Sequence, residues 1–418
     1  MNASSSSAGG LVNSTLRVIW WNGLRLLVQL GWMVALAHWL GVNQYGAFIG
    51  VASLGVAAGG FAGLGMGLKM YRDVATGSVT VAQMWGRVLG VMAWSSMGLF
   101  AAALLVADLV LDLATTFEFQ VLAYLLFSEV VVAPIATQIA FAYASVGDMG
   151  RSAAVPVVLA GARLVALIML PSGVGLHGVA LAHLAATVAG VYFVVMRSGA
   201  RLGVGWRMSG TSRSEVLDAL SYSSLWASGL AVGSLDKSLA LKWGGETAAG
   251  HYSVGQRLAA IASIPVEAIS AAALPRLFRG HDAGLSDGVR IGVMASLAAL
   301  YGVAAGAVVW VAAPFVVVVL GPAFSAIAGL GAWMAAYVLL YCVRVVAASV
   351  LLGRGHIAWR TACEAASLVV FALLAMSLAP ARGAVGAMAA LVSMEAFMAA
   401  LFWARILWPG RRESVSAA

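Results

Sequence analysis

Arginines stand inside stretches of this sequence that are otherwise apolar, and their side chains have the clearest capacity for chemistry. Arg25 has Asn22 three residues before it and Gln29 four residues after it, so the three share one face of a helix. A guanidinium is planar and permanently charged, which suits the oxygens of a phosphate or pyrophosphate. We therefore predict that this polar face binds an anionic group. The alternative is a structural Arg25 held by Glu129 or Asp236.

A second arginine, Arg344, lies near aromatic residues in the sequence. Arg344 follows Tyr337 and Tyr341 by seven and three residues, which places two rings and one cation on one helical face. That combination suits a sugar carrying a phosphate, although aromatic residues at helical spacing also serve packing alone. Arg163 and Arg257 lie in other apolar segments, and we add them to the candidate binding residues.

Four further charged residues fall within apolar segments. They are Asp236, Lys237, Glu129 and Glu395. Charge inside a membrane is costly, so each should serve either as the counter-charge to another charged group or in ion coupling. Adjacent residues on a helix point about 100° apart, so Asp236 and Lys237 are expected to have different partners. The sequence leaves both roles open and favours Asp236 as the counter-charge to Arg25.

The elements that position these residues follow from composition. The 418 residues are 62% hydrophobic and 10% charged, with a mean hydropathy of +0.96, which is too apolar for a water-soluble protein. A helix needs roughly 20 apolar residues to cross a bilayer. About twelve such segments are predicted, at 16–40, 46–68, 88–107, 121–143, 154–170, 177–196, 220–243, 248–274, 291–320, 326–352, 362–378 and 384–406.

The basic residues favour one orientation of these segments. With the amino terminus in the cytoplasm, the inner loops and flanks collect most of the arginines, whereas the outer loops keep only Lys242 and Arg382. This asymmetry follows the positive-inside rule and predicts that both termini are cytoplasmic. It also means that the net charge of +8 is no sign of nucleic-acid binding, since the charge is not gathered on one face.

The two halves of the chain repeat. Gly245 and Gly250 follow Gly41 and Gly46 by 204 residues, and Arg276 follows Arg72 by the same interval. An interval of six helices predicts two lobes of like orientation around a central cavity. The expected organisation is a disordered tail at 1–13, a six-helix lobe at 14–198, a cytoplasmic linker at 199–219, a second six-helix lobe at 220–407 and a tail at 408–418.

Several passages resemble one family of membrane proteins. LGVNQYGAFIGVASLGVAAGGFAGLGMGLKMYRDVA, at 40–75, is similar to the join of the first two helices in the polysaccharide exporter branch of the MOP superfamily, which contains the O-antigen-type flippases. Residues 234–279, 313–324 and 381–393 resemble the seventh and eighth helices, the ninth helix and the last pair. The resemblance implies a MATE-like all-α membrane fold. It also implies transfer of a polyprenyl-pyrophosphate-linked oligosaccharide from the inner to the outer leaflet by alternating access, for surface polysaccharide synthesis.

Two other functions remain open. A cation-coupled multidrug antiporter of the same superfamily should favour buried carboxylates over arginines, because its substrates are usually cationic. A membrane polysaccharide polymerase usually needs a sizeable extramembrane domain, and the longest polar connection here is the linker at 199–219. The chain has lysine only at positions 69, 237 and 242 and has no Walker A sequence, so ATP hydrolysis is not expected.

The expected partners follow from the flippase interpretation. They are the lipid-linked oligosaccharide, the lipids of a bacterial cytoplasmic membrane and, in the same pathway, a polysaccharide polymerase and glycosyltransferases. No catalytic residue, cofactor or metal site is expected, because Cys342 and Cys363 lack the spacing of a metal-binding pair.

Overall fold

A computed structural model describes residues 5–110, 117–171, 173–279 and 287–407, and within these ranges the chain is helical with no strand. The first half contains α1 (Ser5–Gly59), α2 (Met66–Ala75), α3 (Val81–Leu105), η1 (Val106–Val110), α5 (Phe119–Phe127), η2 (Ser128–Val132), α6 (Ala133–Ser145), α7 (Met149–Ile168) and α8 (Leu176–Leu202). The second half contains α9 (Arg213–Val232), α10 (Leu235–Arg279), α11 (Asp287–Ala312), η3 (Ala313–Phe315), α12 (Val316–Leu320), η4 (Pro322–Leu330), α13 (Gly331–Gly353) and α14 (Ile357–Leu407).

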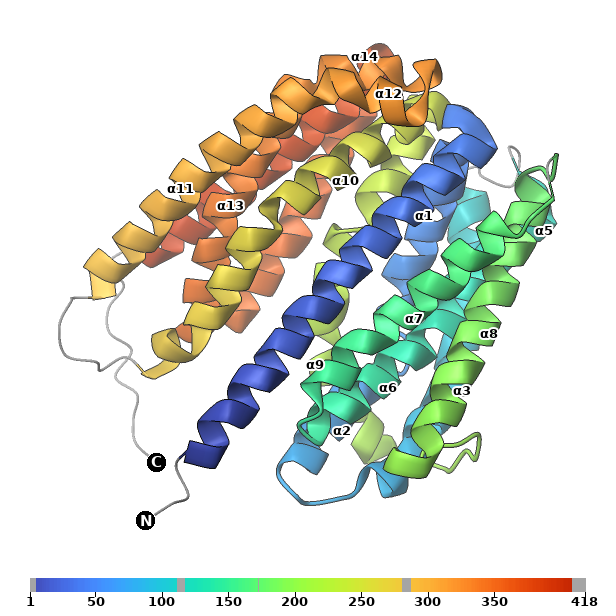
Figure 1. Ribbon diagram of the computed structural model, residues 1–418, viewed down its shortest axis with the longest axis vertical. Coiled ribbons are helices and arrows are strands. Elements are labelled where there is room, and N and C mark those ends of the chain that lie inside the picture. The colour runs from blue at the N-terminus through green and yellow to red at the C-terminus, as the bar shows by residue number, and fades with distance from the viewer. Residues whose placement is uncertain (1–4, 111–116, 172, 280–286, 408–418) are drawn as a thin grey trace. The chain divides into compact units, whose positions relative to one another are not determined.

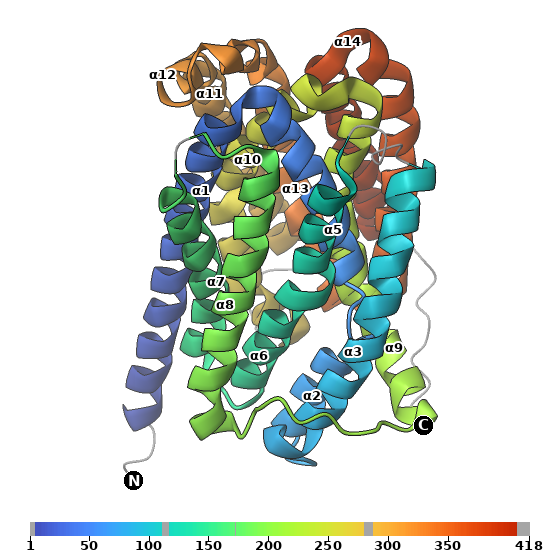
Figure 2. The same cartoon turned by 90° about the vertical axis from the view of Figure 1, so that its right-hand side faces the viewer.

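Three of these helices contain an interruption at a glycine. Gly41 in α1, Gly245 in α10 and Gly383 in α14 have positive φ, a conformation that glycine adopts without steric cost. The chain turns back at the first of these positions, as both ribbon views show for α1 (Figures 1 and 2). Each long helix is therefore two helical segments joined by a tight turn, and in α10 the segment before Gly245 comprises only residues 235–244.

The helices account for the predicted spans. In the described part of the chain, eight helical stretches are long and apolar enough to cross a membrane. The helix α14 holds two of the predicted spans, whereas α1 holds the span at 16–40 and the part of the span at 46–68 that precedes the end of α1 at Gly59. The predicted spans at 220–243 and 248–274 fall on α9 and α10. The protein is thus an all-α, multi-pass membrane protein, as its composition predicts.

The chain forms two compact units. The first comprises residues 1–253 with 317–324, and the second comprises 254–316 with 325–418. Their boundary lies inside α10, whereas the repeat places a lobe boundary in the linker at 199–219. The division into two six-helix lobes stays a prediction. Of the predicted tails, 408–418 lies outside the described residues, and α1 already begins at Ser5.

The core of the first unit lies between α2, α3, α6 and α8. Trp85 of α3 is 2% exposed, and its indole Nε1 donates to the Gly205 carbonyl at 2.7 Å. The linker after α8 runs beside α3, because the Ser209 amide donates to the Gly86 carbonyl at 2.9 Å. These two hydrogen bonds hold the linker against α3.

The repeat is visible as a contact within the first unit. A Cβ on Gly46 would lie 2.0 Å from the Glu246 carbonyl oxygen, and a Cβ on Gly250 would lie 2.3 Å from the Val42 carbonyl oxygen. Thr247 Oγ1 donates to Asn43 Oδ1 at 2.7 Å, and these two residues are also 204 apart. Gly46 thus contacts Glu246, which is equivalent to Val42 in the repeat, and Gly250, which is equivalent to Gly46, contacts Val42. Such a reciprocal pattern is that of a two-fold contact. This reciprocity supports the internal repeat.

In the second unit, small residues bring helices close together. A Cβ on Gly302 of α11 would lie 2.9 Å from the Leu339 Cα of α13, and one on Gly306 would lie 2.9 Å from the Ala335 carbonyl oxygen. Glycines one turn apart commonly mark such close packing in membranes. In α14, Gly386 packs against the Leu378 carbonyl across the turn at Gly383, so the two halves of this helix form a hairpin.

Candidate functional site

A local widening of one membrane helix positions a buried carboxylate of the first unit. Between α5 and α6 the chain forms a π-helical turn, η2, in which the Ala133 amide donates to the Ser128 carbonyl. Pro134 begins the next turn and has no amide hydrogen to continue an α-helical ladder. Single π-helical turns are frequent at functional sites. Here the turn carries Glu129, which is 7% exposed.

Glu129 accepts two hydrogen bonds from bases on neighbouring helices. Its Oε1 lies 2.6 Å from an Arg163 Nη2 and 2.7 Å from His183 Nε2. Arg163 Nε also donates to Thr187 Oγ1 at 3.0 Å, and Ser128 Oγ donates to the same hydroxyl at 3.0 Å. Three helical segments, η2, α7 and α8, therefore meet at one hydrogen-bonded ion pair. We call Glu129, Arg163, His183 and Thr187 the first-unit ionic cluster.

A cavity adjoins this cluster. It has a volume of about 200 Å³, and Glu129 and Arg163 are among its lining residues. Gln138 Oε1 and Ser223 Oγ belong to two other lining residues, are buried and have no hydrogen-bond partner in the described structure. A buried polar atom without a partner is costly, so a cavity of this size and lining is suited to hold water.

A second charged group lies where α9 ends and α10 begins. Lys237 Nζ is 3.0 Å from Asp236 Oδ1, and Tyr252 Oη donates to Asp236 Oδ2 at 2.7 Å. The prediction that Asp236 and Lys237 have different partners is wrong. The long lysine side chain bends back toward the Gly233 carbonyl, where it also reaches the neighbouring carboxylate.

The second unit contains its own buried ion pair. Arg344 of α13 meets Glu395 of α14, with Nε 2.5 Å from Oε2. The Arg344 guanidinium also lies over the Tyr341 ring, 4.6 Å from its centroid, and the Tyr337 and Tyr341 rings are 5.4 Å apart. Tyr341 Oη donates to Glu267 Oε1 of α10. The predicted face of two tyrosines and one arginine is therefore assembled, with a carboxylate at each end.

Arg25 differs from these arginines. It is half-buried on α1 and has no ion pair or hydrogen bond among the described side chains. Gln29 is half-buried and Asn22 is exposed. The alternative in which Glu129 or Asp236 holds Arg25 is wrong in this structure, because each carboxylate is bound by another base. Arg257, in α10, has polar interactions of its own.

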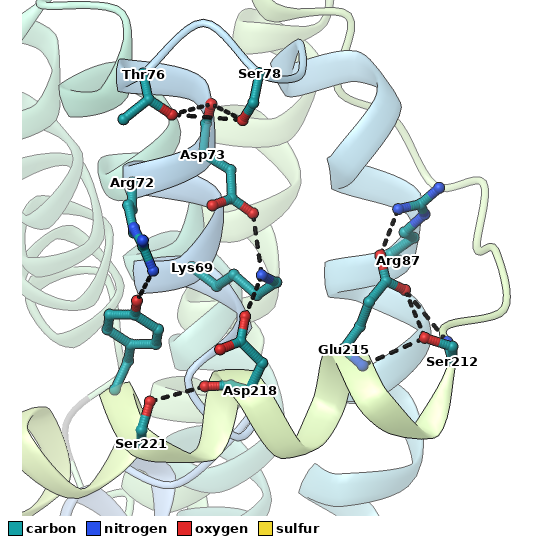
Figure 3. Close-up of polar contacts among 11 residues, drawn as sticks. Lys69, Arg72, Asp73, Thr76, Ser78, Arg87, Ser212, Glu215, Asp218 and Ser221 are labelled. Atoms are coloured by element: carbon teal, nitrogen blue, oxygen red, sulfur yellow. Dashed lines mark hydrogen bonds and ion pairs between the residues drawn. The ribbon is translucent and has the colours of Figure 1, made fainter.

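A group of ion pairs, which spacing along the sequence does not reveal, joins α2 to α9 (Figure 3). Lys69 Nζ lies 2.5 Å from Asp218 Oδ2 and 3.2 Å from Asp73 Oδ2, and Arg72 donates to the Tyr222 hydroxyl. The hydrogen bond with Lys69 holds the pKa of Asp218 below its usual value, and the same bond raises the pKa of Lys69. Both groups are thus charged at neutral pH. We call Lys69, Arg72, Asp218 and Tyr222 the α2–α9 clamp.

Figure 3 also shows how the start of α9 is fixed. Ser212 and Glu215 form a capping box, and Glu215 Oε1 accepts from Arg87 of α3 at 2.7 Å. The capping box satisfies the first free amides of the helix. A signal for it was present, since a serine is followed by a glutamate three residues later, whereas the partners of Lys69 and Arg87 lie too far along the chain to be found by spacing.

Comparison with solved structures decides the fold. No protein-family profile and no curated protein sequence matches the chain. A structure described as an inward-facing multidrug resistance MATE family transporter of the MOP superfamily covers 92% of this chain and 97% of its own, at 17% identity and a TM-score of 0.70. The chain has the fold of the MOP superfamily.

Two other structures widen the comparison with this MOP fold. The lipid II flippase MurJ, in an inward closed conformation, aligns over 94% of this chain and 87% of its own, at 9% identity and a TM-score of 0.72. A MOP superfamily transporter from Pyrococcus furiosus, whose description refers to a reversed polarity of its binding pocket, aligns over 94% of both chains at 15% identity and a TM-score of 0.61. At these identities the likeness establishes the fold alone.

Proposed function

We propose that this MOP-fold protein is a flippase that moves a polyprenyl-pyrophosphate-linked oligosaccharide from the inner to the outer leaflet by alternating access. In this role the protein catalyses no reaction and lies in a bacterial cytoplasmic membrane with both termini in the cytoplasm. Its fold is shared with a lipid flippase as well as with drug transporters. The charged residues within the membrane-spanning helices favour a flippase over a drug transporter.

The main support for this function is that Arg25 has no ion pair among the described residues. In the first unit, the buried carboxylates Glu129 and Asp236 are both bound by bases, so Arg25 is a surplus cation within a membrane-spanning helix. An unpaired charge at this depth is costly and requires a partner. A pyrophosphate headgroup would supply one, since a guanidinium binds phosphate oxygens through two parallel hydrogen bonds. Asn22 and Gln29 add hydrogen-bonding groups on the same face.

The second unit supplies groups for the sugar. Tyr337, Tyr341 and Glu267 combine aromatic faces with hydrogen-bonding oxygens, and Arg344 is held beside them by Glu395. Rings with polar tips bind surfaces that are apolar on one side and polar on the other. We assign Tyr337, Tyr341 and Arg344 to the sugar-phosphate part of the substrate, and we assign Glu395 to holding Arg344 in place.

The test replaces the surplus cation. In a strain that lacks the native protein, Arg25→Ala is expected to reduce surface polysaccharide by about tenfold or more, because a charge-assisted hydrogen bond contributes roughly 1.5–3 kcal/mol. Arg25→Lys keeps the charge and should retain part of the activity. Arg17→Ala is the matched control, since Arg17 is an exposed arginine on the same helix.

Protein levels in the membrane fraction must be equal for all of these variants. Polysaccharide export at the wild-type level in Arg25→Ala would remove this residue, and the charge argument with it, from the mechanism.

One observation favours the alternative of a cation-coupled multidrug antiporter. Glu267 is exposed in the second unit and accepts a hydrogen bond from the Tyr341 hydroxyl, so this unit presents a carboxyl group that a cationic drug could contact. Drug susceptibility of a deletion strain separates the two functions. Loss of resistance with normal polysaccharide would support the antiporter, and Glu267→Gln should then reproduce that loss.

A further inference from the structure

The junction between α9 and α10 interrupts a membrane-spanning segment. The first helix ends at Val232 and the second begins at Leu235, with Gly233 and Ser234 in a turn between them. The Lys237 amide donates to the Ser234 carbonyl at 3.2 Å. The Gly233 carbonyl, at the carboxyl end of α9, accepts from the side chain of Lys237.

The ammonium of Lys237 contacts three oxygens at this junction. Its Nζ lies 3.0 Å from the Gly233 carbonyl oxygen, 3.0 Å from Asp236 Oδ1 and 3.3 Å from Asp236 Oδ2. Asp236 is 1% exposed and Lys237 is 8% exposed, so bulk water does not compete for these contacts. Tyr252 Oη binds the same carboxylate and restricts its orientation.

Oxygens in this arrangement are suited to a small cation. Carbonyl and carboxylate oxygens are the ligands of hard metal ions. Transporters often place coupling-ion sites where a membrane helix is interrupted, because the unpaired carbonyls and the negative end of the first half-helix face the ion there. In this chain the position between a helix carboxyl end and a buried carboxylate holds the lysine ammonium.

We infer that Lys237 is a tethered cation, whose ammonium fills an alkali-cation site built at the α9–α10 junction. The protein therefore needs no free sodium or potassium at this position, and removal of the ammonium would open a site for one. The inference is independent of the cargo, because it concerns only the charge balance of Asp236 and the end of α9.

The experiment measures the thermal unfolding of purified protein in detergent, in sodium, potassium, lithium or choline chloride at equal ionic strength. The wild type should unfold at the same temperature in all four salts. Lys237→Met keeps the length of the side chain without its charge, so it should be destabilised in choline. An alkali cation should then raise its Tm in a saturable manner by about 3 °C or more.

Four further variants complete the experiment. Asp236→Asn combined with Lys237→Met removes the charged ligand and should abolish the response, whereas Lys237→Arg keeps a tethered charge and should show none. Lys242→Met, on the same helix and outside the junction, should behave as the wild type. Lys237→Gln serves as a second neutral variant if the methionine variant does not fold.

Two results would overturn the inference. One is a folded, neutral variant at position 237 whose Tm is the same in choline and in every alkali cation. The other is a wild-type protein that alkali cations stabilise and that loses this response in Asp236→Asn. Because the readout is unfolding and not export, neither result depends on whether the protein is a flippase.

Discussion

Each of the two buried arginines on α7 and α13 is neutralised by one carboxylate. Arg163 pairs with Glu129 and Arg344 pairs with Glu395, and all four side chains are mostly buried. A buried pair of this kind is only weak evidence for stability, but removing one partner is strongly destabilising, because the other is left as an uncompensated charge. The pairs can therefore fix helix positions whether or not a substrate ever contacts them.

Charge compensation within these pairs predicts that single substitutions destabilise the protein more than double substitutions do. Arg163→Met leaves Glu129 without its cation, so it should destabilise the protein by about 3–5 kcal/mol. Glu129→Gln combined with Arg163→Met removes both charges, keeps an acceptor for His183 and should recover most of the loss. Thermal unfolding of the purified variants checks the prediction. A double variant no more stable than Arg163→Met would show that charge compensation is not what holds this cluster.

At the scale of single elements, glycine sets how closely the helices approach. Gly46 and Gly250 lie where α1 and α10 meet backbone to backbone, and any side chain at either position would overlap a carbonyl oxygen. The contact needs a missing Cβ at both positions, and the repeat supplies glycine at both. Gly55 and Gly59 play a similar part, since a Cβ on either would collide with Glu129.

Two glycines of one helix should therefore respond oppositely to alanine. Gly46→Ala introduces a Cβ 2.0 Å from the Glu246 carbonyl oxygen, and the overlap should cost about 1–3 kcal/mol. Gly23→Ala meets no atom within 4 Å and should be neutral or stabilise the helix by roughly 0.5–1 kcal/mol. Unfolding temperatures of the two variants test this difference. Equal effects would show that the close approach is not maintained in the membrane.

At the scale of the whole molecule, the reciprocal contact relates the two halves of the sequence. Asn43 and Thr247 occupy equivalent positions in the repeat and bind each other directly. In transporters built from repeats, alternating access moves one repeat against the other about the substrate site. A contact between equivalent residues would then have to separate when that end of the molecule opens.

A cross-link at this contact should stop transport if the proposed mechanism holds. Asn43→Cys combined with Thr247→Cys places two thiols where the side chains now hydrogen-bond at 2.7 Å. Oxidation should join them and abolish polysaccharide export, and reduction should restore it. Each single cysteine variant is the control and should be insensitive to oxidant. Normal export by fully cross-linked protein would mean that these turns stay together throughout the cycle.

Much of the fold was predictable from the sequence because the lipid bilayer requires each crossing helix to be a continuous run of apolar residues. A membrane helix must have roughly 20 apolar residues, and such runs can be read off directly. Most of each predicted span is helical in the structure, although 46–68 runs past the end of α1 at Gly59 and 220–243 crosses the turn between α9 and α10. The repeat was also detectable, because the glycines needed for its turns and contacts recur at a constant interval of 204 residues.

The pairing of charges was decided only by the tertiary structure. Hydropathy places Glu129, Arg163 and Asp236 at membrane depth, but it carries no information on which helices are neighbours. The pairing of Asp236 with Arg25 predicted from the sequence is therefore wrong, and no partner for Arg163 was predicted. Once the helices pack, Glu129 meets Arg163 from 34 residues away, Lys237 bends back to Asp236, and Arg25 is left without an ion pair among the described residues. The hydropathy of the surrounding residues predicts the membrane depth of each charge, but the packing of helices against one another determines its partner.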